Sequence, residues 1–199
     1  MIYRAVLWDW DGTLFDSDRE CWRANTKVHV KHGLPTEGYE VYRRRIGNGI
    51  VRSVGPIAQN IIDQVRVDFF TEFDSSNCHL IEGVDEVLFE IKRRGLSCGI
   101  VSAHGESEII ERMEKFGITH HFRRVVGGMR NKSPALLNVC DEFGVAPKET
   151  LFVGDLLSDV LDGNAAGLHT VLYAPDDYPH MQYPTHRIAH LREIIRLLD

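Results

Sequence analysis

The sequence has little of several features that mark particular classes of protein. Its four cysteines lie far apart and form no CxxC pair: Cys21, Cys78, Cys98 and Cys140. We therefore expect free thiols in a reducing compartment, not a disulfide framework. No apolar run is long enough to cross a membrane, and the start of the chain turns acidic too early for a signal peptide. These absences predict a cytoplasmic protein with no membrane partner.

Basic charge is also scarce. Lys and Arg number 23 against 29 for Asp and Glu, which gives a net charge of -6. Because phosphate backbones reward basic surfaces, this balance argues against a nucleic-acid partner. The 199 residues contain no internal repeat and suffice for one core with a smaller insert. A monomer and a homodimer are both compatible with the sequence.

The second part of the chain alternates short apolar runs with amphipathic stretches. The strand-like runs are 3–8, 96–101, 124–128, 151–154 and 170–174. The helical stretches are 83–95, 106–117, 133–144 and 158–167, each closing at a glycine. The alternation predicts an α/β fold, a Rossmann-like doubly wound parallel sheet of about five strands. We expect the tail to form a loop and then a short amphipathic helix that covers the sheet.

The segment between the first strand and residue 82 is helical in character. Its three helical stretches are 17–33, 37–49 and 56–73. Ser17 and Glu20 have the spacing of a capping box at the start of the first stretch. We therefore predict an α/β core of residues 1–15 and 82–199, interrupted by a helical cap of residues 16–81.

Chemically useful side chains follow the predicted strands in order. Asp9 and Asp11 follow the first strand, Ser102 the second, Lys132 the third, and Asp155 and Asp159 the fourth. Because ligands of open parallel sheets bind beyond the carboxyl ends of the strands, these groups should converge. Carboxylates with one ammonium and one hydroxyl suit a divalent cation such as Mg²⁺ that holds a phosphate.

Each feature alone has an ordinary explanation. Asp-Gly after a strand is usually a turn, and Ser102 is equally suited to capping the next helix. A single lysine is most often solvated, and Asp155 and Asp159 could share an exposed helix face. Their ordered placement at consecutive strand ends is what favours a common site.

Four segments resemble the motifs of one known family. They are "DWDGTLFDS", "GIVSAHGE" with Ser102, "RNKSPAL" with Lys132, and "VGDLLSDVLDGNAAG". They are similar to the four motifs of the haloacid dehalogenase superfamily, in its phosphatase branch with a small helical (C1-type) cap. The resemblance covers essentially the whole chain, and phosphoglycolate phosphatase is the nearest named activity.

The resemblance implies a phosphatase mechanism with defined residue roles. Asp9 would attack phosphorus to form an aspartyl-phosphate, and Asp11 would act as general acid and then general base. Mg²⁺ would be held by Asp9, the main-chain carbonyl of Asp11 and Asp155, with Asp159 in support. Phosphoryl oxygens would be held by Ser102, Lys132 and the first loop, and substrate contacts are implied at Gly12, Thr13 and Ala103. The substrate would be a small phosphorylated metabolite.

Two departures keep alternatives open. No proline follows Lys132, so Arg130 is a second candidate for the third motif. The Ser102-Ala103 pair is also similar to β-phosphoglucomutase relatives, so a sugar phosphomutase is a rival function. A non-catalytic binding protein with the same fold is another. The presence of Asp11 argues against a dehalogenase, since a halide leaving group needs no proton.

The predicted cap contains the run "YRRRIGNGI", in which Gly47 and Gly49 would allow a tight turn. Arg45, or its neighbours Arg43 and Arg44, could bind a carboxylate or a second phosphate through the planar guanidinium. The alternative is a solvated helix end. Of the ten histidines, His104 is the one close enough to Ser102 to line the pocket. We expect Trp8 and Trp10 to pack around the site.

Overall fold

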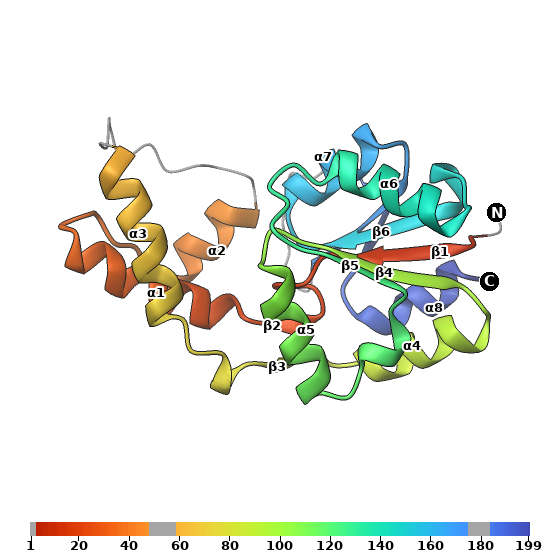
Figure 1. The fold of residues 1–199 in the computed structure, drawn as a ribbon, viewed down its shortest axis with the longest axis horizontal. Helices are drawn as coiled ribbons and strands as arrows, with labels where there is room; N and C mark the ends of the chain where they lie inside the picture. Colours follow the sequence, from red (N-terminus) through yellow and green to blue (C-terminus); the bar gives the residue numbers. More distant parts are fainter. Residues whose placement is uncertain (1–2, 48–58, 175–183) are drawn as a thin grey trace.

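A computed structural model describes residues 3–47, 59–174 and 184–199 of the protein. Its main element is a parallel sheet with the strand order β5-β4-β1-β6-β7-β8 (Figure 1). The strands are β1 (Ala5–Trp8), β4 (Ser97–Val101), β5 (Arg124–Val126), β6 (Thr150–Gly154), β7 (His169–Tyr173) and β8 (His186–Ile188). Strand β1 lies between β4 and β6, with Trp8 aligned to Ile100 and to Val153.

Helices cover both faces of this sheet (Figure 1). They are α4 (Val84–Arg93), α5 (Glu106–Lys115), α6 (Ser133–Phe143), α7 (Leu157–Ala165) and α8 (Ile194–Leu197). Side chains of β1 alternate between two cores: Val6 and Trp8 pack with α4, α5 and α8, whereas Ala5 and Leu7 pack with α6. A strand buried on both faces reads as a continuous apolar run. The predicted doubly wound sheet is confirmed.

The sheet has six strands where the sequence predicted about five. The additional strand β8 pairs in parallel with β7, with Ile188 aligned to Tyr173. The sequence predicts a loop in this part of the tail. The three residues "HRI" are too few to display the alternating pattern of a strand, which is why β8 was missed. The short helix predicted at the end of the tail is present as α8 and packs against α4.

The segment after β1 forms the predicted group of helices, α1 (Asp18–Lys31), α2 (Tyr39–Gly47) and α3 (Gln59–Glu72). These helices lie to one side of the sheet (Figure 1). The chain enters and leaves them through a two-stranded antiparallel pair, β2 (Phe15–Asp16) with β3 (His79–Leu80). This pair was not predicted, and it lies where we place the boundaries of the cap. Those boundaries stay predictions, and Gly49 lies outside the described residues.

The predicted capping box at the start of α1 is wrong. Ser17 occupies the cap position, but its hydroxyl donates to Asp11 and not to the helix. The carboxylate of Glu20 instead accepts hydrogen bonds from Arg23 and from the main-chain N–H of Asp74. Ser17 therefore ties the start of the cap to the loop after β1, whereas Glu20 joins two parts of the cap itself. None of the helices in the described parts of the chain is long and apolar enough to cross a membrane.

Candidate active site

The predicted site residues converge at the carboxyl edge of the sheet. Asp9 follows β1, Ser102 follows β4, and Asp155 follows β6, and these three strands are neighbours. All three side chains are buried, with 4%, 1% and 1% of their surfaces exposed. Burying polar groups costs free energy unless they have hydrogen-bond or charged partners. We therefore look for the partners of each of these side chains.

The loop after β1 brings Asp155 close to the main chain. Gly12 has a φ of +72°, and a Cβ at this position would lie 2.5 Å from Oδ2 of Asp155. Glycine is therefore required both for the left-handed conformation and for the close approach. The next residue, Thr13, is fully buried, and its hydroxyl donates to Oδ1 of Asp155 at 3.1 Å.

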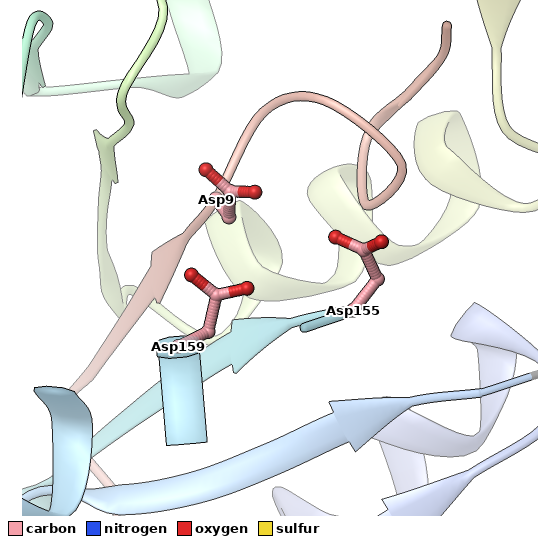
Figure 2. A group of neighbouring side chains, drawn as sticks. All are labelled: Asp9, Asp155 and Asp159. Carbon is pink, nitrogen blue, oxygen red and sulfur yellow. The ribbon is translucent and has the colours of Figure 1, made fainter. Parts of the chain in front are cut away.

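Asp9, Asp155 and Asp159 form one acidic cluster (Figure 2). Each offers a carboxylate oxygen, and these oxygens lie within 4.8 Å of one another. Asp159 lies in α7, which begins three residues after the end of β6. A buried set of carboxylate oxygens fits the preference of hard divalent cations. The main-chain contact predicted for Asp11 stays a prediction.

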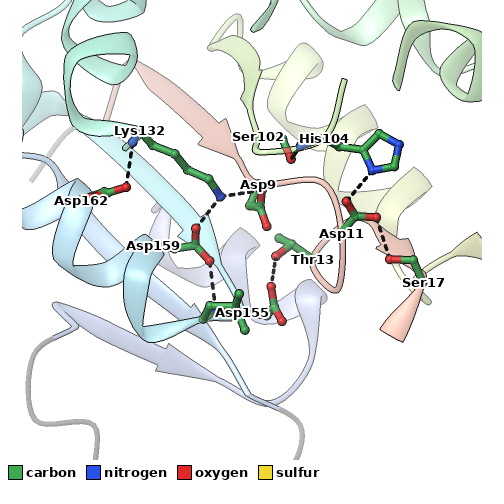
Figure 3. A network of polar contacts seen from close by, with 11 residues as sticks. Asp9, Asp11, Thr13, Ser17, Ser102, His104, Lys132, Asp155, Asp159 and Asp162 are labelled. Atoms are coloured by element: carbon green, nitrogen blue, oxygen red, sulfur yellow. Dashed lines mark hydrogen bonds and ion pairs between the residues drawn. The ribbon is translucent and has the colours of Figure 1, made fainter. Parts of the chain in front are cut away.

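Lys132, the N-cap residue of α6, reaches this cluster (Figure 3). Its Nζ lies 2.7 Å from Oδ1 of Asp9 and 2.5 Å from Oδ1 of Asp159. Its main-chain N–H donates to Asp162 at 2.7 Å, which fixes the start of the helix. Arg130, the alternative for the third motif, is exposed and lines a cleft. Lys132 is thus the basic residue of this segment that contacts the carboxylates.

Burial and neighbouring charges shift the pKa values of this cluster strongly. Burial raises the pKa of Asp9 to about 6, because the attraction of Lys132 only partly offsets the loss of solvent and the nearby Asp159. The pKa of Asp155 is raised well above its usual range, mainly by burial and then by the charge of Asp18. Burial opposes the charge of Lys132, yet its two carboxylate partners outweigh that and raise its pKa.

One arginine of the cap also reaches the cluster. The guanidinium of Arg43, in α2, lies 3.0 Å from Oδ2 of Asp155 and 2.9 Å from Oδ2 of Asp18. The sequence marked Arg43 as one of three candidate cap arginines but gave no sign of this contact. Arg45 instead pairs with Glu37 inside the cap, with 2.8 Å between Nε and Oε1. The substrate contacts predicted for Arg45 and Gly47 stay predictions.

Asp11 points away from the acidic cluster (Figure 3). Its Oδ1 accepts a hydrogen bond from Ser17 at 2.7 Å, and its Oδ2 lies 2.8 Å from Nδ1 of His104. Burial raises the pKa of Asp11, but the hydrogen bonds from His104 and Ser17 and the nearby charge of Arg112 outweigh burial and lower it. The sequence placed His104 near the pocket, and its contact with Asp11 is an additional finding.

A cleft lies between the cap helices and the core, next to Ala103, the residue after Ser102. Its volume is about 590 Å³, and Ala103 and Arg130 line it on the core side. Tyr42, Phe69 and Phe70 line it on the cap side. A cavity of this size is in the range that holds a small organic ligand. Trp8 and Trp10, on either side of Asp9 in the sequence, are fully buried in the same core.

The fold is thus a doubly wound α/β sheet with an inserted helical cap, and a buried polar cluster lies at the carboxyl edge of the sheet. The chain belongs to the haloacid dehalogenase-like hydrolases, a family that matches residues 6–173. The membership predicted from the four motifs is therefore confirmed, and with it the prediction of an enzyme.

Named relatives agree with the phosphatase branch. Phosphoglycolate phosphatase 1 of Pseudomonas aeruginosa is 30% identical, over 98% of this chain and 80% of that protein. The N-acetylmuramic acid 6-phosphate phosphatase of the same organism is 27% identical, over 100% of this chain and 96% of that protein. The structure of a hydrolase of this superfamily from Geobacter sulfurreducens matches 98% of this chain and 100% of that one, with 25% identity and a TM-score of 0.71.

Proposed function

We propose that the protein is a magnesium-dependent phosphate-monoester hydrolase that acts on a small phosphorylated metabolite through an aspartyl-phosphate. The observation that carries this proposal is the separation of the two acids of the first motif. Asp9 lies beside an ammonium and two further carboxylates, whereas Asp11 is held apart by Ser17 and His104. A nucleophile and a proton carrier need such different surroundings.

Asp9, Asp155 and Asp159 would hold the Mg²⁺ ion, because they supply buried oxygen ligands close together. When bound, Mg²⁺ neutralises the charge that phosphate adds to this acidic edge. Lys132, whose ammonium contacts both Asp9 and Asp159, would help to neutralise the same charge. Without these cations, a phosphate would be repelled by the carboxylates.

In the first half of the reaction, the carboxylate of Asp9 attacks phosphorus and the bond to the leaving oxygen breaks. Asp11 gives its proton to that oxygen, which departs as an alcohol. In the second half, Asp11 takes a proton from water, whose oxygen attacks phosphorus and releases phosphate from Asp9. Ser102, Lys132 and main-chain N–H groups of the loop after Asp9 hold the phosphoryl oxygens, because charge stabilisation dominates this chemistry.

The cleft next to Ala103 supports a small organic leaving group. The relatives are named for phosphoglycolate and for N-acetylmuramic acid 6-phosphate, and both names denote phosphate esters of carboxylic acids. Arg130 provides an exposed cation on the wall of this cleft. We therefore include phosphorylated carboxylic acids among the substrates to test first.

The decisive experiment measures phosphate release from a panel of phosphorylated metabolites, with Mg²⁺ and with EDTA. We expect Mg²⁺-dependent turnover that Asp9→Asn abolishes, with one phosphate released per substrate consumed. Turnover that survives Asp9→Asn contradicts the assignment of the nucleophile. Appearance of an isomeric sugar phosphate instead of free phosphate favours the phosphomutase, and no turnover on any substrate favours a binding protein.

A further inference from the structure

Asp11 stands at one end of a string of three polar side chains that comes from three parts of the chain. Nδ1 of His104 lies 2.8 Å from Oδ2 of Asp11. On the other side of the same ring, Nη1 of Arg112 lies 2.7 Å from Nε2. His104 follows β4 closely, and Arg112 lies in α5. The string therefore connects the helix after the second motif to the loop of the first.

The chemistry of arginine determines which nitrogen of His104 carries hydrogen. A guanidinium has only donors, so Nε2 of His104 must accept from Arg112. An imidazole that accepts at Nε2 is neutral and carries its hydrogen on Nδ1. Nδ1 then donates to Asp11, and the hydrogen bond is directed at one oxygen of that carboxylate.

His104 is held in place by main-chain hydrogen bonds and by neighbouring aromatic rings. The main chain of His104 is fixed by hydrogen bonds to Oγ of Ser102 and to the N–H of Gly128. Its ring meets Phe70 and Phe73 edge-on, with centroids 6.5 and 6.1 Å apart. Only 8% of the His104 side chain is exposed. The ring therefore has little freedom to turn.

Arg112 is equally constrained. Its guanidinium carbon lies 5.6 Å from the ring centres of both Phe15 and Phe73. Within the described parts of the chain, His104 is the one hydrogen-bond partner of the Arg112 side chain, whose Nε is buried without a partner. Among the described residues no carboxylate forms an ion pair with Arg112, so its guanidinium, held between two aromatic rings, is directed at the imidazole.

We propose that Arg112 and His104 are positioning residues for Asp11: Arg112 fixes the Nδ1–H form of His104, and that N–H orients the carboxylate for proton transfer to the leaving oxygen. This inference rests on the proposed function, in which Asp11 is the general acid. The proton that reaches the leaving oxygen is the one on Asp11, and His104 keeps its own. Ser17 holds the other oxygen, so the carboxylate is fixed at both ends.

Two substitutions of His104 separate positioning from packing. The amide nitrogen of His104→Asn reaches the place of Nδ1, whereas that of His104→Gln reaches the place of Nε2. We compare kcat/KM for an alkyl phosphate with that for p-nitrophenyl phosphate, whose leaving group departs without a proton. His104→Gln should lower the alkyl value by roughly 10- to 100-fold and the aryl value by less than about 3-fold. His104→Asn should restore most of the alkyl activity.

The outcomes distinguish this inference from the proposed function. Asp11→Asn should show the same selectivity for the alkyl ester, and if it does not, Asp11 is not the general acid. Asp11→Asn is expected to be selective for the alkyl ester. If it is, but His104→Gln lowers kcat/KM equally for both substrates, the positioning role is refuted. It is also refuted if His104→Asn does not restore activity on the alkyl phosphate. His120→Gln, at an exposed histidine, serves as the matched control.

A measurement without turnover tests the same inference. Long-range ¹H–¹⁵N spectra of the wild-type protein at neutral pH report the tautomer of His104, which is assigned by comparison with His104→Asn. We expect the neutral Nδ1–H form, and we expect Arg112→Met to convert it to a mixture, while Arg112→Lys retains it. An Nε2–H ring or an imidazolium in the wild-type protein overturns the inference.

Discussion

Replacing Asp9, the proposed nucleophile, should make the metal-free protein more stable. Asp9 is 4% exposed, and its pKa is raised to about 6 by burial and by the neighbouring carboxylate of Asp159. Its charged form is therefore less stable in the folded protein than in the unfolded chain. Asp9→Asn removes this charge and keeps an oxygen that can accept from Lys132 at the place of Oδ1. Function at this position thus opposes stability.

The magnitude follows from the pKa. A rise from 3.8 to about 6 corresponds to about 3 kcal/mol between the two protonation states. The asparagine resembles the protonated acid, so at neutral pH Asp9→Asn should stabilise the protein by about 3 kcal/mol. For a chain of this length, that is roughly 6 to 12 °C in Tm.

The pH dependence has a defined sign. Below about pH 4 Asp9 is protonated in both states, and the difference between variant and wild type should vanish. As the pH rises from about 4 to about 6, only the unfolded chain releases its proton readily, so the wild-type protein loses stability relative to the variant. Taking the difference between the two proteins cancels the contributions of other carboxylates.

The assay is urea denaturation in EDTA, followed by circular dichroism at several pH values between 4.5 and 8. A variant that is less stable than the wild type at neutral pH, or a gain that does not change with pH, refutes the reasoning. Asp11→Asn is the matched control, two residues along the chain. Because the pKa of Asp11 is lowered, its charged form favours folding, so this variant should lose stability at neutral pH.

Three further predictions concern the same edge of the sheet. Gly12→Ala should cost about 1–3 kcal/mol in thermal unfolding, because it strains a positive φ and drives a methyl group against Asp155; unchanged stability contradicts that geometry. Lys132→Met should cost about 3–5 kcal/mol, because two buried carboxylates lose their shared cation, whereas Arg130→Met should leave the Tm nearly unchanged. Mg²⁺ should raise the Tm of the wild-type protein and of Lys132→Met, and this shift should be absent in Asp155→Ala, as a thermal titration would reveal.

The main sheet was predictable because each longer strand is a continuous apolar run and each longer helix has apolar residues at helical spacing. The run 96–101 is observed as Ser97–Val101, and the stretch 106–117 as Glu106–Lys115. The strands that sequence reasoning missed are short. Strands β2 and β3 have two residues each and pair across more than sixty positions, so no local period marks them. Strand β8 is defined by its neighbour β7, not by its own three residues.

The convergence of the acidic groups was predictable from topology, since residues that follow parallel strands meet at one edge. The contacts of Arg43 and Arg112 were not. Arg43 reaches Asp155 across 112 positions, and this depends on how the cap helices lie against the core. Three consecutive arginines look alike in a sequence, and packing alone selects which of them faces the site. His104 had one signal, its place two residues after Ser102.

The two acids of "DWDG" are separated because Trp10, between them, is anchored. Trp10 is fully buried, belongs to the same core as Trp8, and stacks on Phe15 with ring centres 5.2 Å apart. Asp9 therefore faces the acidic cluster, while Asp11 reaches Ser17 and His104 beyond the turn. Both pKa values are displaced against the proposed roles: that of Asp9 is raised and that of Asp11 is lowered.

Each ligand corrects one of these displacements. A divalent cation beside Asp9 favours its charged form and lowers its pKa, and the negative charge of a bound phosphate raises the pKa of Asp11. Neither ligand alone corrects both residues, because the two carboxylates belong to different hydrogen-bond networks. We therefore expect the reactive combination, an ionised Asp9 with a protonated Asp11, to be populated only when cation and phosphate ester are bound together.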